Sequence, residues 1–194
     1  LAPGTLSLER HRLMWLYLKN NTSLFQQTAK VLHVAPEQCF YKRFKSLKNW
    51  EYLSTDLHSP LADIKADLCA LPFEDNSYDV VFCTLFLEHI ENDAKALQEL
   101  HRVLKPGGLG IFQVPQDLQR TSTYEDASIR TAAERKKHFG QYDHVRVYGQ
   151  DYFDRLRKAG FEVNPLKCTE LVSEENIEIY RLSSTEILPI CRKS

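Results

Sequence analysis

The stretch between residues 66 and 115 constrains the fold of this chain more than any other part of the sequence. Its centre, residues 79–83 (Asp-Val-Val-Phe-Cys), is a short and almost unbroken apolar run, entered through the turn-forming residues 75–77. A strand that is apolar on both faces is typical of a parallel sheet with helices packed on either side.

A helix and a second strand are predicted directly after this run. Asn92 or Asp93 is a suitable N-cap residue, and leucine and valine recur at helical spacing up to residue 104. The Lys-Pro-Gly-Gly of residues 105–108 ends that helix, and residues 109–114 form a further strand. Strand, helix and strand within about forty residues form a βαβ unit, so we predict an open, mostly parallel α/β sheet with helices on both faces. Ligands of such sheets bind beyond the carboxyl ends of the strands.

Weaker patterns complete the predicted sheet. Three strands are expected before the central run, at residues 31–35, 50–55 and 64–66, and a final antiparallel pair at residues 161–167 and 187–192. Further helices are expected to begin at Ser7, Pro36 and Asp151 and to cover residues 174–181, and residues 134–137 are expected to form a charged helical turn. The length of 194 residues fits one domain, in which residues 1–28 form an N-terminal helix or lid and residues 29–194 the main part.

Composition excludes several classes of protein. The formal net charge of −1 and the hydrophobic content of 43% are ordinary for a globular enzyme. No apolar run approaches the ~20 residues of a membrane span and no signal peptide is recognised, so we expect a cytoplasmic protein with no membrane partner. The five cysteines are odd in number and form no Cys-x-x-Cys pair, so we expect buried free thiols rather than disulfides or a zinc site.

The first fifty residues are basic, with a net charge of +6, although the whole chain is nearly neutral. A basic face can attract an anionic substrate or RNA, but it is more often the solvated surface of a helix. The interleaving of aromatic and basic residues that is typical of RNA-binding modules does not accompany these charges. We therefore do not expect nucleic acid binding, and keep RNA as an alternative partner.

Four segments together resemble a known family. LPFEDNSYDVV (residues 71–81) and LKPGG (residues 104–108), with Asp67 and LEHI (residues 87–90), resemble the class I S-adenosylmethionine-dependent methyltransferases, most closely their broad small-molecule branch. The likeness extends more weakly over residues 30–193. It implies a Rossmann-like fold, S-adenosyl-L-methionine as methyl donor, S-adenosyl-L-homocysteine as product, and residues 29–194 as the methyltransferase domain. One branch of the family has a cysteine-bearing zinc ribbon ahead of a segment like this chain's SLERHR; no cysteine precedes it here, so no metal site is predicted.

The loop after the first predicted strand departs from the pattern of that family. His33 stands where the family has an acidic residue, and Ala35, Glu37 and Cys39 stand at its glycine positions. Glycine lets a backbone approach a ligand closely, so an empty, degenerate loop is the alternative to a binding loop. Pro36 donates no N–H and Glu37 would repel phosphates, which argues against a dinucleotide such as NAD. S-adenosylmethionine has no phosphate and carries a sulfonium and an ammonium, for which a nearby carboxylate is favourable.

Acidic residues follow two successive predicted strands. Asp56, followed by Leu57, is placed to accept hydrogen bonds from a ribose diol, and the alternative is a turn or cap residue. By the resemblance, Asp67 matches the acid at the adenine amino group and Leu68 the residue that flanks the ring; a loop aspartate is the alternative.

The segment after the fourth predicted strand begins at Thr84 and, by the resemblance, lies where the family holds the methionine part of the cofactor and the acceptor. His89 is a candidate general base, or a histidine packed beside a helix start. No Asp/Asn-Pro-Pro-aromatic motif is present, which argues against methylation of nucleobase or glutamine amino groups by the usual route. The predicted cofactor site consists of His33, Ala35, Pro36, Glu37, Asp56, Leu57, Asp67, Leu68, Thr84, Leu85 and His89.

A long segment, residues 116–150, follows the fifth predicted strand. His144, Arg146 and Tyr148 alternate within it, so an extended backbone points all three the same way. Loops of this length are usually functional, and we predict that the three side chains form a wall of the acceptor pocket. The alternative is an edge strand in which Arg146 pairs with an acid and only holds the loop, with Asp143 and Asp117 as candidates. The predicted catalytic residues are His89, His144, Arg146 and Tyr148.

These observations predict a methyltransferase that acts on oxygen or nitrogen of a small molecule or a glycan by in-line displacement. Positioning can supply ~7–11 kcal/mol of barrier reduction, so no protein nucleophile is required, and a base is needed only for a hydroxyl acceptor. The alternatives are an RNA methyltransferase that uses the basic first fifty residues, and a non-catalytic domain of the same fold that binds a nucleoside. The sequence identifies neither the acceptor nor the oligomeric state.

Overall fold

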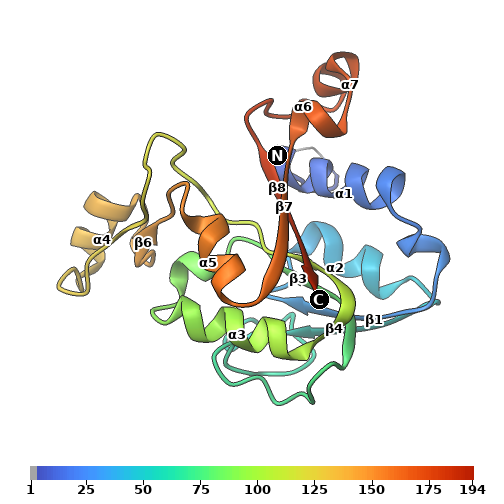
Figure 1. Ribbon diagram of the computed structural model, residues 1–194, viewed down its shortest axis with the longest axis horizontal. Coiled ribbons are helices and arrows are strands. Elements are labelled where there is room, and N and C mark those ends of the chain that lie inside the picture. The colour runs from blue at the N-terminus through green and yellow to red at the C-terminus, as the bar shows by residue number, and fades with distance from the viewer. Residues whose placement is uncertain (1–3) are drawn as a thin grey trace.

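A six-stranded sheet with the order β2-β1-β3-β4-β8-β7 forms the centre of the molecule (Figure 1). The computed structural model describes residues 4–194. The strands β1 to β4 run parallel, β8 is antiparallel to β4, and β7 is antiparallel to β8. Their bounds are β1 (Ala29–Val34), β2 (Trp50–Thr55), β3 (Tyr78–Cys83), β4 (Leu104–Ile111), β7 (Phe161–Lys167) and β8 (Ile187–Lys193). The predicted fold class, a mostly parallel sheet with helices on both faces and a final antiparallel pair, is confirmed.

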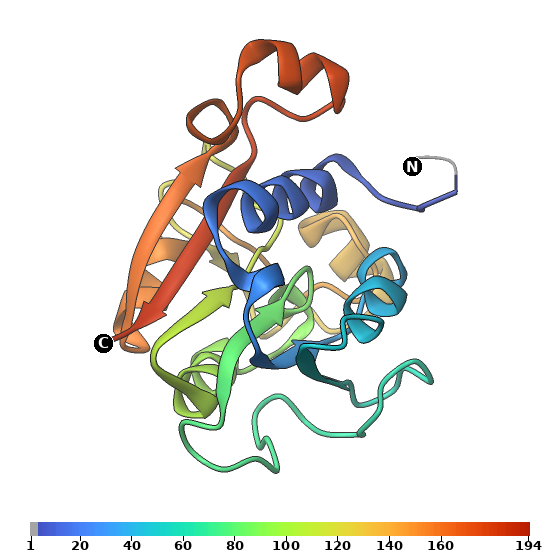
Figure 2. The same cartoon turned by 90° about the vertical axis from the view of Figure 1, so that its right-hand side faces the viewer.

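Helices cover both faces of this sheet (Figures 1 and 2). They are α1 (Glu9–Asn21), α2 (Gln38–Lys45), α3 (Asp93–Val103), α4 (Ala132–Phe139), α5 (Tyr152–Lys158), α6 (Cys168–Leu171) and α7 (Glu174–Ile179), with the short 3-10 turns η1 (Leu24–Gln26) and η2 (Leu87–His89). A small two-stranded sheet, β5 (Tyr124–Glu125) with β6 (Arg146–Val147), lies with α4 at the left end of Figure 1. Between residues 4 and 194 no helix is long and apolar enough to cross a membrane.

The central strand β3 explains the layered arrangement. Val80 and Phe82 belong to the core that α1 and α2 cover, whereas Val81 and Cys83 belong to the core that α3 and α5 cover. Burying one large apolar side chain stabilises the fold by roughly 1.5–3 kcal/mol, so a strand that is apolar on both faces needs helices on both sides. All five cysteines are unpaired, and three of them are buried: Cys83, Cys168 and Cys191.

Helix α1 shares a core with the sheet. Its residues Met14 and Leu18 pack in one buried cluster with Val31 of β1 and Phe44 of α2. The N-cap residue is Leu8 rather than the predicted Ser7. The division of the chain at residue 28 stays a prediction, and the packing shows that α1 covers the sheet directly.

Two predicted strands differ from the structure. Residues 64–66 form no regular strand, because only Ile64 makes a parallel bridge, to Thr55, and the exposed segment has no apolar face to bury. The strand predicted at residues 109–114 begins earlier, at Leu104, which already pairs with Tyr78 before the register shifts. The Lys-Pro-Gly-Gly turn therefore lies inside the irregular start of β4.

The sheet order defines where a ligand is expected. From β1 the chain passes to β2 on one side, and it later returns to β3 on the other side of β1. The topological switch point therefore lies between the carboxyl ends of β1 and β3, and ligands of such sheets bind in the crevice outside that point.

Candidate functional site

The Glu37 carboxylate lies at this switch point. Glu37 follows β1 and is the N-cap residue of α2. Its Oε2 accepts a hydrogen bond of 2.6 Å from Thr84 Oγ1, directly after β3, and its Oε1 lies 2.5 Å from His11 Nε2 on α1. Because His11 Nδ1 accepts the Leu8 N–H, the ring proton is on Nε2, which donates to Glu37. One carboxylate thus joins α1, β1 and β3.

This carboxylate is ionised at neutral pH. Burial raises the pKa of Glu37, but the hydrogen bonds from His11 and Thr84 outweigh burial and hold the pKa below its usual range. A largely buried anion where ligands are expected favours a cationic ligand over a phosphate.

The backbone on both sides of the switch point is left-handed. Ala35 has a φ of 49° and donates its N–H to Thr55 O at 2.8 Å, while Leu85 has a φ of 52° and donates its N–H to Gln113 O at 2.8 Å. Side chains with a Cβ disfavour this conformation by roughly 1–2 kcal/mol. The loop at Ala35 thus keeps a conformation for which glycine is best suited, at a position where the resemblance places a glycine, and the neighbouring Pro36 is buried.

The two predicted adenosine-binding acids each use one oxygen in a local turn. Asp56 Oδ1 accepts the N–H groups of His58 at 2.7 Å and Ser59 at 2.6 Å, and Asp67 Oδ1 accepts the Cys69 N–H at 2.8 Å. Neither Oδ2 atom accepts a hydrogen bond from residues 4–194. The turn role predicted as the alternative is therefore present in both acids, and the ligand role stays a prediction that depends on the second oxygen of each carboxylate. Of the residues that follow these acids, Leu57 is exposed and Leu68 is buried.

His33 lies inside the core. The strand β1 continues past it to Val34, and its ring is fully buried against Phe44, Tyr52 and Phe82. Its Nδ1 lies 2.9 Å from Tyr52 Oη. Burial lowers the pKa of His33 to about 4, so the ring is neutral at physiological pH. The structure thus places His33 on the face of the sheet that α1 and α2 cover, and its predicted contact with the cofactor stays a prediction.

His144, Arg146 and Tyr148 lie on one side of an extended segment, and all three are buried. The Val145 N–H donates to Glu88 O at 2.9 Å, which places the segment against η2, immediately after β3. The alternation thus predicted the common direction of the side chains, whereas their partners come from η2 and the start of α3.

Arg146 is surrounded by acceptors of the protein itself. Its guanidinium donates to the backbone carbonyls of Leu87 (3.1 Å), Glu91 (2.9 Å) and Ile90, and its Nε donates to Glu125 Oε2 at 2.9 Å. Arg146 thus pairs with an acid, as the alternative account expected, but the partners are Glu125 of β5 and, at 3.8 Å, Asp93 rather than Asp143 or Asp117.

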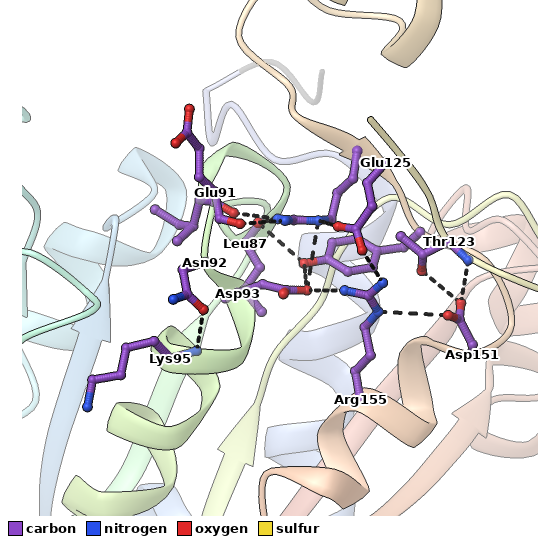
Figure 3. Close-up of polar contacts among 12 residues, drawn as sticks. Leu87, Glu91, Asn92, Asp93, Lys95, Thr123, Glu125, Asp151 and Arg155 are labelled. Carbon is purple, nitrogen blue, oxygen red and sulfur yellow. Dashed lines mark hydrogen bonds and ion pairs between the residues drawn. The ribbon is translucent and has the colours of Figure 1, made fainter. Parts of the chain in front are cut away.

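Asp93 extends this network to α5 (Figure 3). Its Oδ2 accepts hydrogen bonds of 2.9 Å from Tyr148 Oη and from Arg155 Nη1, while Arg155 Nη2 donates to Glu125 Oε1 at 2.7 Å. Asn92 accepts the helix-capping hydrogen bond, which leaves the Asp93 carboxylate available. Burial, followed by the charge of Asp93, raises the pKa of Tyr148, so the phenol stays protonated. The network holds the insertion on the sheet, and a catalytic role for Arg146 and Tyr148 stays a prediction.

A cluster of titratable side chains lies beside the switch point. One ligand-type atom from each of Glu88, His89 and His144 lies within 4.8 Å of the others, and His89 Nδ1 is 3.4 Å from Asp143 Oδ2. Burial raises the pKa of Glu88 to about 7 and lowers the pKa of His144. The sequence placed Glu88 in the segment after β3 without a role of its own and named Asp143 only as a possible partner of Arg146, although each is the acidic neighbour of a histidine. His11 was not predicted as a partner of Glu37, and the chain offers no local signal for that contact.

A cleft of about 280 Å³ opens at the carboxyl ends of β3 and β4. Its lining includes Leu85 and Gln116 from the segments that follow β3 and β4, Arg10 from α1, and Glu186, which precedes β8. Burial raises the pKa of Glu186, and the charge of Arg10 opposes that effect. The charge of Arg10 also lowers the pKa of Glu88, against the larger effect of burial.

Comparison with known proteins agrees with this geometry. Residues 17–112 match a family model described as a methyltransferase domain. The solved structure of an S-adenosylmethionine-dependent methyltransferase from Mesorhizobium loti has the same fold, with a TM-score of 0.60 and 16% identity over 93% of this chain and 98% of that chain. The fold and the acidic strand ends define a class I methyltransferase fold. Residues 17–112, just under half of the chain, thus match the methyltransferase-domain family, and the predicted resemblance to S-adenosylmethionine-dependent methyltransferases and the predicted cofactor are confirmed.

Curated relatives match shorter segments of the chain. A sterol 4-C-methyltransferase of Caenorhabditis elegans is 34% identical over 82 residues, which are 42% of this chain and 22% of that protein. The mitochondrial arginine hydroxylase NDUFAF5 of Mus musculus is 30% identical over 128 residues, which are 65% of this chain and 35% of that protein. The chain thus spans only about a fifth to a third of the length of these relatives, and their names describe two different reactions.

Proposed function

We propose that this protein transfers the methyl group of S-adenosylmethionine to oxygen or nitrogen of a small-molecule or glycan acceptor. The observation that carries the proposal is the ionised Glu37 carboxylate at the switch point. When bound, S-adenosylmethionine supplies a methyl group already activated on a sulfonium, so the protein has to bind, orient and exclude water. A dinucleotide would bring its phosphates against this anion.

Three acidic residues bind different parts of the cofactor in this proposal. Glu37 interacts with the ammonium or sulfonium side, where a cationic donor replaces the Thr84 hydroxyl. The free Oδ2 of Asp56 accepts from the ribose hydroxyls, and that of Asp67 accepts from the adenine amino group. The buried Leu68 flanks the ring.

The acceptor is assigned to the cleft beside Leu85. Its volume of about 280 Å³ suits a small acceptor or one sugar unit, and Arg10 provides a cation for an anionic or hydroxyl-rich group. For a hydroxyl acceptor, His89 is the candidate base, oriented by Asp143 at 3.4 Å. Arg146 and Tyr148 act as positioning residues that hold the segment after β3.

The structure offers less support for RNA as the acceptor. Part of the basic charge in the first fifty residues is engaged within the fold: Lys30 lies 3.6 Å from Glu51, and Lys45 pairs with Asp63. Arg12 donates to the backbone carbonyls of residues 180 and 181. RNA binding that weakens steeply with salt would favour this alternative.

Calorimetric titration of the purified protein with S-adenosylmethionine, S-adenosylhomocysteine and NAD tests the proposal. We expect both adenosyl compounds to bind and NAD to bind far more weakly. A panel of hydroxyl and amine acceptors, followed by release of S-adenosylhomocysteine, then tests transfer separately from binding. Cofactor binding without transfer to any class of acceptor would support the non-catalytic alternative, and tight NAD binding without adenosyl binding would overturn the proposal.

A further inference from the structure

Three side chains that can bind a metal lie close together near the carboxyl end of β3. Glu88 and His89 lie in η2, directly after β3, and His144 comes from the insertion that packs against η2. One oxygen or ring nitrogen from each lies within 4.8 Å of the other two. The two rings meet edge to face, with centroids 4.8 Å apart.

Two buried atoms of this cluster have no hydrogen-bond partner in the described part of the chain. Glu88 is 2% exposed and His144 is 6% exposed, yet Glu88 Oε2 and His144 Nε2 are buried and have no hydrogen-bond partner among residues 4–194. Leaving a buried polar atom unsatisfied costs roughly 1–3 kcal/mol, and native proteins rarely keep two side by side. The pair therefore points to a missing ligand.

The carboxylate of Asp143 lies near the outer side of the His89 ring. Its Oδ2 lies 3.4 Å from His89 Nδ1, on the residue that precedes His144. Metal-binding histidines commonly donate their other ring N–H to a carboxylate, which fixes the tautomer and strengthens the ligand. With Nδ1 turned to Asp143, Nε2 of His89 is the nitrogen available to a metal.

We propose that Glu88, His89 and His144 bind one divalent first-row transition-metal ion. Two imidazoles and one carboxylate form the ligand set that zinc and iron(II) take in proteins, whereas magnesium and calcium prefer oxygen ligands alone. Sequence spacing did not predict the site, because His144 is far from His89 along the chain. With an ion bound, His89 would no longer be the base for a hydroxyl acceptor, and water on the ion would take that role. The inference therefore goes beyond the proposed function.

The geometry requires a modest contraction. Zinc–nitrogen and zinc–oxygen bonds of about 2.0–2.1 Å in a tetrahedron place ligand atoms about 3.4 Å apart. The ligand atoms of the three side chains lie up to 4.8 Å from one another. Side-chain rotations that move these atoms by about an ångström would bring them to the distances of a zinc site. Three protein ligands leave at least one position for water or for an oxygen of the acceptor, which would place the ion next to the cleft that Arg10 lines.

Metal binding by the untagged full chain tests the inference. We expect zinc chloride to bind with a stoichiometry of one in calorimetry after treatment with a chelator. His89→Ala and His144→Ala should each weaken binding at least ~100-fold, and Asp143→Asn by roughly 10–100-fold. His58→Ala, which removes an exposed histidine of the β2 loop, is the matched control and should bind zinc as the wild type does.

Cobalt(II) spectra distinguish binding at this site from binding by any of the five cysteines. Cobalt at this site should give visible ligand-field bands of nitrogen and oxygen ligation without a thiolate charge-transfer band. His89 is partly exposed, so His89→Ala keeps the test open if His144→Ala fails to fold. No stoichiometric binding, a thiolate spectrum, or equal affinity of wild type and His89→Ala would overturn the inference. S-adenosylmethionine titration of the same samples shows separately whether the cofactor site works.

Discussion

The strand ends around the switch point and the insertion of residues 116–150 contain similar polar side chains but use them differently. Asp56, at the end of β2, and Asp67, in the loop that follows the bridge at Ile64, each keep one carboxylate oxygen free of hydrogen bonds from residues 4–194. In the insertion, the guanidinium of Arg146 is occupied by carbonyls and by Glu125. A polar side chain that lies near a binding site can therefore contact a ligand only through donor or acceptor atoms that make no hydrogen bond within the protein.

The largest effect is expected for Arg146→Ala. Arg146 is buried, and its removal takes the donor from three backbone carbonyls, whereas Glu125 keeps Arg155 as a partner. Each buried acceptor left unsatisfied costs roughly 1–3 kcal/mol, so we expect a loss of several kcal/mol. Urea unfolding should therefore show a marked loss of stability, with activity following the folded fraction. Arg130→Ala, at an exposed arginine of the same insertion, is the control and should change stability by less than about 0.5 kcal/mol. A stable Arg146→Ala protein that binds cofactor but does not transfer would instead make Arg146 a residue of the acceptor pocket.

At the strand ends, Asp56→Ala should act on the cofactor. A hydrogen bond to a charged group contributes ~1.5–3 kcal/mol, so the affinity for S-adenosylmethionine should fall roughly 10–100-fold in calorimetry. Asp56→Asn separates the two roles, because it keeps an acceptor for the turn at His58 and presents an amide to the ribose. It should lose affinity with little change in melting temperature. Unchanged affinity in both variants would remove Asp56 from the cofactor site.

The pH dependence of stability shows whether His33 is a core residue or contacts the cofactor. Because its pKa is about 4 in the folded protein and 6.5 without burial, the unfolded state binds more protons between these values. Stability should therefore fall as the pH is lowered from 6.5 towards 4, by about 2 kcal/mol at pH 5 for this group. His33→Phe should flatten this slope in urea titrations at several pH values. A variant with the wild-type slope but weakened cofactor binding would place His33 at the ligand instead.

The smallest effect is expected for Glu37→Gln. The amide keeps an acceptor for Thr84 or His11 but loses the charge, so about 1 kcal/mol of S-adenosylmethionine affinity should be lost, roughly 5-fold. NAD affinity should not rise appreciably, because Pro36 still lacks an N–H and the substitution adds no backbone N–H to the loop. Competition titrations of both ligands measure this. An affinity for S-adenosylmethionine that improves would mean that Glu37 shields the site rather than recognises the cation.

The fold could be predicted where burial leaves a local signature. Residues 79–83 are apolar on both faces and became β3 as predicted, and the final antiparallel pair was found at β7 and β8. Residues 64–66 lack such a signature, since this segment is largely exposed and is held by one bridge to β2. Whether a segment at the edge of a sheet forms a strand depends on its pairing partner, and the local sequence does not show that partner.

The candidate site could be predicted only in part, for a related reason. Acids placed directly after strands are visible in a sequence, because parallel strands bring their ends to one edge. The partner of Arg146 is not visible, since Glu125 reaches it through the path of the insertion. Likewise, His11 meets Glu37 only because α1 packs on the sheet. Alternation tells which way a side chain points, and the tertiary fold decides what it meets.

The attachment of Arg146 to the carbonyls of Leu87, Ile90 and Glu91 has a consequence for recognition. The segment after β3 loses its conformational entropy when the chain folds, so a ligand does not have to order it. More of the contact energy then remains as affinity, and association needs no slow rearrangement of this wall. Because this segment is fixed before binding, it cannot move to admit a larger acceptor. Selectivity among chemically similar acceptors should therefore depend mainly on their size and shape.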